Sequence, residues 1–193
     1  ERWCVMGQNG SGKTPLLKMV AGHLQPDAGV VKLGSVKMGY FAQQALELLD
    51  PELTVYEQVD QKFHLEPTSV KRTLLGAFQF SGDDQDKLIK FLSGGEKSRL
   101  VLALMLFDPP NFLVLDEPTN HLDMLTKEML VQTLQNFDGT MLFVSHDRGF
   151  LRGLANRVLD VSECAAGKPA NAYPGSYLEW VEKTGMEAPG VHR

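Results

Sequence analysis

The sequence predicts an α/β fold with a mostly parallel sheet and a separate helical lobe. Short apolar runs, at residues 112–115 and 140–144, alternate with segments of helical spacing, as in buried parallel strands joined by crossover helices. A glycine-rich loop at 7–14 lies between the first apolar run and the first helical pattern. Residues 46–92 carry more charge and have helical rather than strand periodicity, so they are predicted to form the separate lobe.

The composition limits the classes of protein to which the chain can belong. Its 193 residues, 43% of them apolar, suffice for one globular unit with a buried core. A formal net charge of −5 argues against a surface built mainly to neutralise nucleic-acid phosphates. The two cysteines, Cys4 and Cys164, lie far apart and lack metal-ligand spacing, which favours reduced thiols in a cytoplasmic protein.

Nothing in the sequence indicates a membrane or a secretory protein. No apolar run approaches the roughly 18 residues of a membrane span, and no signal peptide is recognisable. We therefore expect a soluble, cytoplasmic domain without a membrane segment. The first residues, ERWCVMGQNG, enter an apolar run at once, without a start methionine or a turn. The sequence is accordingly expected to be a fragment of a longer chain, without the strands that precede it.

Periodicity and turn residues give the order of elements. Residues 3–6 are predicted to form a strand and residues 16–24 a helix. Two alternating runs, 30–33 and 36–41, flank a Gly-Ser pair, which predicts a short hairpin. The remaining predicted elements are a helix capped by Ser93 and running to 107, strands at 112–115, 140–144 and 157–161, helices at 125–136 and 149–156, and a loop at 162–171.

Residues 7–14, GQNGSGKT, fit the phosphate-loop pattern GxxxxGK[ST]. In this pattern glycines let backbone amides curl around phosphate oxygens, a lysine neutralises the phosphates, and a hydroxyl reaches Mg²⁺. The position between a predicted strand and a predicted helix favours this interpretation over a glycine-rich turn with a solvated lysine. Lys13 is therefore expected at the β- and γ-phosphates, and Thr14 at Mg²⁺. The other predicted nucleotide-binding residues of the loop are Gly7, Asn9, Gly10, Ser11 and Gly12.

Pro15, directly after this loop, is unusual because proline has no N–H and disfavours the helical region for the preceding Thr14. In a first helical turn this costs the helix little, since those amides have no helical acceptor. If an amide at this position normally donates to a phosphate, its loss weakens binding by about 1.5–3 kcal/mol. We therefore expect ATP binding to survive with an affinity lower by roughly one to two decades.

Two adjacent carboxylates, Asp116 and Glu117, follow the apolar run 112–115. The carboxyl ends of parallel strands face the crevice in which α/β sheets bind ligands. There, Asp116 can hold Mg²⁺, and Glu117 can polarise an attacking water as a general base. The alternative is an exposed acidic turn after a strand, which the presence of the phosphate loop makes the weaker interpretation.

The segment LSGGE offers a second anion site at a predicted helix start. Ser93, Gly94 and Gly95 can present a hydroxyl and bare amides to a γ-phosphate. Ser93 can equally be an ordinary N-cap, with Glu96 as its capping-box partner three residues later. The two interpretations are compatible.

In this order, GQNGSGKT, LSGGE, LVLDEPTNHLD and VSHDR resemble the motifs of the nucleotide-binding domain of the ATP-binding cassette (ABC) superfamily. The resemblance covers nearly the whole chain and implies a P-loop NTPase fold. In that family the LSGGE motif of one domain closes over ATP held by another, so hydrolysis needs a head-to-tail pair. The predicted domain, 1–180, has a core at 1–45 and 108–162 and a helical lobe at 46–107 with the signature motif, and a C-terminal tail follows at 181–193.

The resemblance implies roles for three further residues. Gln43 in YFAQQ becomes the Q-loop residue near Mg²⁺, with catalytic and metal-binding roles, and Asp123 in NHLD the acid at the seam of the domain pair. His146 becomes the switch residue on the γ-phosphate. The plainer alternatives are a solvated loop amide for Gln43, a helix cap for Asp123 and a helix neighbour for His146. An imidazole directly after a buried strand can still donate to an anionic oxygen.

Three segments resemble the ABC-F branch of this superfamily in detail, namely FSGDDQDKLIKFLSGGE, DEPTNHLD and AYPGSYLEW. This resemblance implies a cytoplasmic Mg²⁺-dependent ATPase that acts on the ribosome near tRNA, in translation regulation or antibiotic resistance. FSGDDQDK is most similar to the C-terminal one of the two nucleotide-binding domains of such chains. The adenine-stacking residue is then expected upstream of Glu1.

Two alternative functions stay open. One is the ATP-hydrolysing subunit of a membrane transporter, although such domains tend to contain SGGQxQR and SALD instead. The other is a weakly active nucleotide-binding partner domain, in which Pro15 marks a decayed site. The presence of Lys13, Asp116, Glu117 and His146 argues against decay.

Overall fold

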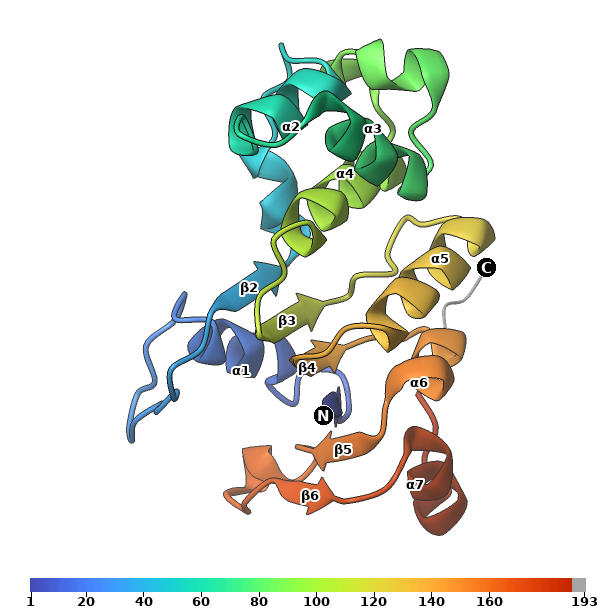
Figure 1. Ribbon diagram of the computed structural model, residues 1–193. Helices are drawn as coiled ribbons and strands as arrows, with labels where there is room; N and C mark the ends of the chain where they lie inside the picture. The colour runs from blue at the N-terminus through green and yellow to red at the C-terminus, as the bar shows by residue number, and fades with distance from the viewer. Residues whose placement is uncertain (189–193) are drawn as a thin grey trace. The chain divides into compact units, whose positions relative to one another are not determined.

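The computed structural model describes residues 1–188, apart from the side chains of Gln43 and Gln44. These residues divide into two compact units, one built on a sheet and one made mainly of helices (Figure 1). We call them the sheet unit and the helical unit. The sheet unit contains Glu1–Phe41, Pro110–Thr119 and the chain from Leu130, and the helical unit contains Ala42–Pro109 and Asn120–Met129.

Six strands within residues 1–188 form one sheet, in the order β2-β3-β4-β1-β5-β6. All neighbouring strands are parallel except β6, which runs antiparallel to β5. The predicted α/β fold with a mostly parallel sheet is thus confirmed. The strands are β1 (Arg2–Met6), β2 (Met38–Phe41), β3 (Phe112–Asp116), β4 (Thr140–Val144), β5 (Arg157–Asp160) and β6 (Asn171–Tyr173). The α-helices of the sheet unit are α1 (Lys13–Val20), the second half of α5 (Met124–Gln135), α6 (Arg148–Leu154) and α7 (Tyr177–Thr184).

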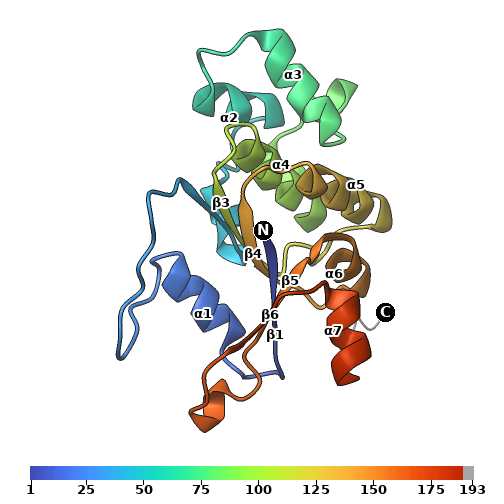
Figure 2. The ribbon, with the colours of Figure 1, turned by 60° about the horizontal axis from the view of Figure 1, so that its bottom comes forward.

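Helices cover both faces of the sheet. Phe143 of β4 packs edge-on against Phe150 of α6, with the ring centroids 5.5 Å apart. The next residue of the strand, Val144, belongs instead to a buried cluster with Leu17 of α1. Because successive side chains of a strand point to opposite faces, α1 and α6 lie on opposite sides of the sheet (Figure 2). This double coverage explains the continuous apolar runs in the sequence.

The helical unit is organised by helices with well-formed N-termini. Thr54 and Glu57 form a capping box at the start of α2, and Ser93 and Glu96 form another at the start of α4. Each box satisfies backbone N–H groups that have no partner within the helix. The elements of this unit are α2 (Val55–Lys62), α3 (Thr68–Ala77), α4 (Gly94–Leu106), the 3-10 helices Gln43–Leu48, Gly82–Asp86 and Ile89–Phe91, and the first half of α5 (Met124–Gln135).

The hairpin predicted at 30–33 and 36–41 is wrong. Only β2 forms there, and it pairs in parallel with β3 rather than with the residues before it. Residues 30–37 contain no strand, and the Val30 side chain is 77% exposed. Alternating apolar residues indicated an extended segment, but the alternation contains no information about which strand would pair with it.

The structure shows the state of the two cysteines, the conformation of the segment 162–171 and the character of the described helices. Cys4 and Cys164 are free thiols, as predicted, and burial raises the pKa of Cys4 to about 12. The segment 162–171, predicted to be a loop, contains a 3-10 helix at Cys164–Ala166 and the first residue of β6. Among the described helices, none has both the length and the apolar character required to cross a membrane.

The buried centre of the sheet is expected to dominate the stability of the sheet unit. Leu113 is fully buried in β3, whereas Leu178 of α7 is 46% exposed. Leu113→Ala should lower the free energy of unfolding by about 2–5 kcal/mol because it leaves a cavity. Leu178→Ala, the same chemical change at a half-exposed position, should have a clearly smaller effect. Denaturant unfolding measures both, and equal losses would contradict this description of the core.

Candidate nucleotide-binding site

The predicted phosphate loop connects β1 directly to α1. Gly10 and Gly12 have φ values of 83° and 88°, a left-handed conformation that residues with a side chain rarely adopt. Gly12 is the N-cap of α1, and no side chain caps this helix. The first amides of α1 are therefore not engaged by a side-chain acceptor, which is the arrangement that binds anions at helix N-termini.

Ser11 is packed closely within the loop, and its hydroxyl has no hydrogen-bond partner among the described residues. A Cβ atom on Gly7 would lie 2.4 Å from Ser11 Oγ, so the loop closes tightly only because residue 7 is glycine. Ser11 Oγ is buried and has no hydrogen-bond partner among the described residues. Buried hydroxyls are normally paired. An anionic ligand in the loop would supply the missing acceptor.

Lys13 is folded back on the loop. Its Nζ donates to the carbonyl oxygens of Gly7 at 2.8 Å and Gln8 at 2.9 Å. Partial burial lowers the pKa of Lys13, while the negative charges of Glu117 and Asp116 oppose that shift. The ammonium of Lys13 is therefore within electrostatic range of the predicted general base Glu117 and the predicted Mg²⁺ ligand Asp116.

Thr14 and Asp116 meet across 102 residues of sequence. Thr14 Oγ1, in the first turn of α1, donates to Asp116 Oδ1 at the end of β3 over 3.2 Å. Burial raises the pKa of Asp116, and the hydrogen bond from Thr14 and the charges of Lys18 and Lys13 oppose this. A hydroxyl beside one carboxylate matches the few protein ligands that Mg²⁺ takes when phosphates and waters complete its shell. No cluster of three or more His, Cys, Asp or Glu side chains suited to a metal exists in residues 1–188.

Pro15 is the third residue of α1 and is exposed. The expectation that Pro15 disfavours the helical region for Thr14 is wrong, because α1 already begins at Lys13. The amide of the next residue, Leu16, closes the first turn by donating to the Gly12 carbonyl at 2.9 Å. Proline is tolerated here because the amides of a first turn have no helical acceptor to lose.

Glu117 follows β3 in a strained backbone conformation. Its φ is 51°, in the left-handed region that is uncommon for residues other than glycine, and its N–H donates to the Val144 carbonyl at 3.0 Å. Its side chain is 19% exposed. Burial raises the pKa of Glu117, although the neighbouring His146 lowers it in part. A raised pKa makes this carboxylate a better proton acceptor, which suits a general base.

His146 contacts Glu117 from the loop after β4. The backbone N–H of His146 donates to Glu117 Oε2 at 3.2 Å. Its Nε2 lies 3.3 Å from Oε1, an oxygen that is buried and has no aligned hydrogen-bond donor. The imidazole and the carboxylate thus face one another at the carboxyl edge of the sheet. β3, β4 and β1 are consecutive neighbours there, so the sheet unit brings together the phosphate loop, Asp116, Glu117 and His146.

The LSGGE motif forms the capping box that its sequence allowed. Ser93 Oγ accepts from the Glu96 N–H at 3.2 Å, and Glu96 Oε2 accepts from the Ser93 N–H at 2.7 Å. Ser93 and Gly94 are exposed. The Ser93 hydroxyl proton is not engaged in the box, so it is available to an anion in addition to the capping role.

Lys87, a residue that the motif analysis missed, neutralises this glutamate. Its Nζ lies 3.1 Å from Glu96 Oε1. Burial of Glu96 would raise its pKa, but the hydrogen bonds from Ser93 and Lys87 and the charge of Lys87 outweigh burial, and the pKa is lowered. The carboxylate at the start of α4 would repel an anion, and Lys87 offsets part of that repulsion. Only the tertiary contact reveals this, because Lys87 lies nine residues before Glu96.

The segment that contains Asp123 contacts α4, the helix that begins at the LSGGE motif. Asp123 accepts from the Thr126 N–H at 2.9 Å and from Thr126 Oγ1 at 2.7 Å, so it caps the start of α5 as one of its two interpretations predicted. These hydrogen bonds lower the pKa of Asp123. Arg99 of α4 donates to Thr126 Oγ1 at 3.0 Å and lies 3.5 Å from Asp123 Oδ2. Arg99, which the motifs did not identify, therefore ties the signature helix to this segment.

The helical unit thus contains a second group of predicted residues, formed by Ser93, Gly94, Gly95 and Asp123. Gln43 lies at the start of the 3-10 helix Gln43–Leu48, and its side chain is outside the part of the chain that the structure describes. Its predicted roles therefore stay predictions.

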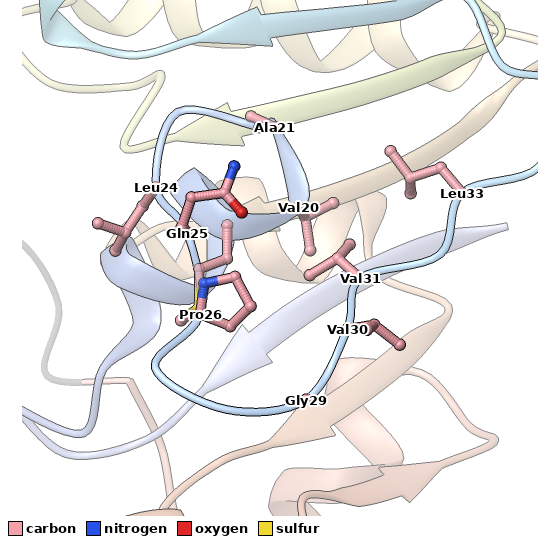
Figure 3. A pocket seen from close by; sticks show the side chains of 11 residues that line it. Val20, Ala21, Leu24, Gln25, Pro26, Gly29, Val30, Val31 and Leu33 are labelled. Carbon is pink, nitrogen blue, oxygen red and sulfur yellow. The ribbon is translucent and has the colours of Figure 1, made fainter.

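A hollow of about 340 Å³ lies at the other end of α1 from the phosphate loop. Figure 3 shows its wall formed by the end of α1, including Val20, and by the chain that follows, including Leu24, Pro26 and Val31. None of its lining residues is charged. Its position and its apolar lining distinguish it from the predicted nucleotide site.

Comparison with known proteins decides the family. A family model described as ABC transporter matches residues 1–120. The chain belongs to the ATP-binding cassette family. It is 40% identical over 189 residues to "Probable ATP-binding protein YbiT" of Escherichia coli O157:H7, an alignment that covers 97% of this chain and 35% of that protein. It is 44% identical over 152 residues to ATP-binding cassette sub-family F member 3 of Mus musculus, covering 78% of this chain and 21% of that protein.

A solved structure extends this likeness to the fold. The archaeal ribosome recycling factor aABCE1, in complex with the archaeal ribosomal stalk protein aP1, superposes with a TM-score of 0.73 and 27% identity. The match covers 95% of this chain and 36% of that one. The predicted ABC-F resemblance is confirmed by the relatives. The cassette chain spans about a third or less of the length of the curated relatives named above.

The start of α4 provides a test of how tightly the signature motif packs. A Cβ on Gly95 would lie 2.8 Å from the His121 carbonyl oxygen, whereas one on Gly94 would meet nothing within 4 Å. Gly95→Ala should therefore destabilise the helical unit by about 1–3 kcal/mol through overpacking. Gly94→Ala should be neutral or stabilise by up to about 1 kcal/mol. Unfolding measurements on the two variants that gave equal effects would refute the close approach.

The raised pKa of Glu117 makes a prediction about stability and pH. A carboxyl whose folded-state pKa is raised binds its proton more tightly in the folded protein, so its ionisation lowers stability at neutral pH. Glu117→Gln should raise the thermal midpoint at pH 7. The gain should shrink as the pH falls toward about 4.3, the ordinary value for glutamate. Glu182→Gln, at an exposed position of α7, is the control. It should change neither the thermal midpoint at pH 7 nor the way that midpoint depends on pH. A loss of stability in Glu117→Gln at pH 7 would contradict the assignment.

Proposed function

We propose that this cassette domain binds MgATP at the phosphate loop and hydrolyses it to ADP and phosphate. The observation that carries the proposal is the convergence of Thr14, Asp116, Glu117 and His146 at one sheet edge beside an uncapped helix N-terminus. Each group has the chemistry that phosphoryl transfer requires, which is charge neutralisation, metal binding or proton acceptance.

Phosphate binding falls to the loop and Lys13. The amides at the start of α1 and the orphaned Ser11 hydroxyl donate to phosphate oxygens, and Lys13 moves from the loop carbonyls to the β- and γ-phosphates. Thr14 and Asp116, which already share a hydrogen bond, are the residues that would hold Mg²⁺. When bound, Mg²⁺ neutralises charge that develops on the phosphates. Gln43 is assigned a supporting role beside it.

Glu117 is the proposed general base. A water oxygen attacks the γ-phosphorus, the bond from that phosphorus to the bridging oxygen of ADP breaks, and the water proton passes to the Glu117 carboxylate. His146 lies against that carboxylate and can donate from Nε2 to the γ-phosphate once phosphate is present. The left-handed backbone of Glu117 keeps its side chain at the sheet edge, where such strain is typical of functional residues.

The exposed LSGGE motif supports a paired mode of action. Ser93, Gly94 and Gly95 and the neighbouring Asp123 are proposed to complete the ATP site of a second cassette domain, either in the same longer chain or in a dimer mate. Lys87 supports this role, because it offsets the charge of Glu96 where the phosphate of that second site would approach.

The proposed cellular partner is the ribosome with its bound tRNA, and the proposed compartment is the cytoplasm. The sub-family F relative and the likeness to the ribosome recycling factor aABCE1 support this assignment. On this proposal, ATP-driven closure of two cassettes changes how the protein acts on the translating ribosome, in translation regulation or antibiotic resistance.

Glu117→Gln tests the proposed reaction. The substitution keeps the shape of the side chain but removes the base, so turnover should fall by about 10²–10⁴-fold while ATP remains bound. Phosphate release is measured over a range of chain concentrations, because a paired site gives a rate that rises faster than the concentration. Glu182→Gln is the matched control. Parental turnover in Glu117→Gln would remove Glu117 from the mechanism.

A further inference from the structure

Arg148 follows His146 by two residues and begins α6, yet its side chain contacts the end of the described chain. Its Nε donates to the Ala188 carbonyl at 2.8 Å, and its Nη1 lies 3.2 Å from Glu187 Oε2. Arg152, one turn later on the same helix, donates to Glu187 Oε1 at 2.7 Å. Both carboxylate oxygens of Glu187 are therefore occupied by α6.

The residues after α7 are held from the other side as well. α7 ends at Thr184, and its C-cap Gly185 has a φ of 69°, in the left-handed region. Ala188 is 1% exposed, and its N–H donates to the hydroxyl of the buried Tyr177 at 2.9 Å. α6 and α7 lie side by side (Figures 1 and 2). Glu187 and Ala188 thus bridge the two helices through side-chain and backbone contacts.

Two hydrogen bonds of Asp147 connect the first turn of α6 to the His146 loop. Asp147 is the N-cap of α6 and accepts from the Phe150 N–H at 3.0 Å. The Asp147 N–H in turn donates to Ser145 Oγ at 3.1 Å. His146 lies between these two anchored residues, so a displacement of the first turn of α6 displaces His146 relative to Glu117.

We propose that Arg148 is a positioning residue, which fixes the first turn of α6 through Glu187 and Ala188 and thereby holds His146 against Glu117. The inference rests on the proposed function, because the position of His146 matters only if it acts on phosphate. An isolated exposed ion pair contributes little. Here two nitrogens of one planar guanidinium, Nε and Nη1, contact a carbonyl and a carboxylate, a fork that the single ammonium nitrogen of lysine cannot reproduce.

The first test needs no ATPase activity. The chain has five histidines, so imidazole signals are resolvable by NMR, and His146→Gln identifies the signal of His146. Arg148→Lys and Glu187→Gln should both shift the His146 signal and leave those of His23 and His64 in place. The matched controls are Arg157→Lys, whose side chain donates to the Pro174 carbonyl, and Glu163→Gln, whose side chain pairs with Lys168 on the surface. An unmoved His146 signal in folded Arg148→Lys overturns the proposal.

The second test uses turnover. Arg148→Lys and Glu187→Gln should lower kcat about tenfold with KM for ATP nearly unchanged, since misplaced catalytic groups act on the chemical step. The double variant should lose clearly less than the sum of the two single losses, because both single variants break the contact between Arg148 and Glu187. Additive losses, or a change in melting temperature without a change in kcat, overturn the positioning role. A parent cassette that does not hydrolyse ATP even when paired with a second cassette domain contradicts the proposed function, whereas the NMR result still decides whether Arg148 positions His146.

Discussion

The parallel pairing of β3, β4 and β1 is the constraint on which the candidate site depends. Because these three strands run in the same direction, their carboxyl ends lie at one edge of the sheet. The segments that follow them are therefore close in space although they are distant in sequence. The hydrogen bond between Thr14 and Asp116 and the contact between Glu117 and His146 both form at this edge. The buried apolar runs that hold the three strands in register therefore also set the geometry of the polar groups.

This geometry places two carboxylates and a lysine in a partly buried region, where burial disfavours their charged forms. Burial raises the pKa values of Asp116 and Glu117 and lowers that of Lys13, and Glu117 also has a strained backbone. Such departures are typical of sites where function, rather than stability, determines the residues. In the helical unit the charge of Glu96 is instead offset by Lys87. A bound phosphate would offset the positive charge of Lys13, and a bound cation would offset the negative charges of Asp116 and Glu117.

Features carried by a local pattern could be predicted from the sequence. The phosphate loop, the carboxylates after a strand and the Ser93 capping box each follow from residue types at fixed spacing. The hairpin at 30–41 was wrong because alternation does not specify a partner strand, and helix α1 overrode the local preference of Thr14 before Pro15. The contacts of Arg99 and Arg148 could not be predicted, since a long charged side chain can choose among many acceptors and only tertiary proximity selects one.

Calorimetric titration of MgATP is the measurement that tests the account most directly, with the parent chain, Pro15→Thr and Lys13→Ala compared. The account predicts saturable, Mg²⁺-dependent binding by the parent and its near loss in Lys13→Ala. Pro15→Thr should bind more tightly by about one to two decades, since it restores an amide at the phosphate loop. Absence of binding in both the parent and Pro15→Thr would contradict the nucleotide site, and equal affinities in these two chains would show that the amide does not face a phosphate.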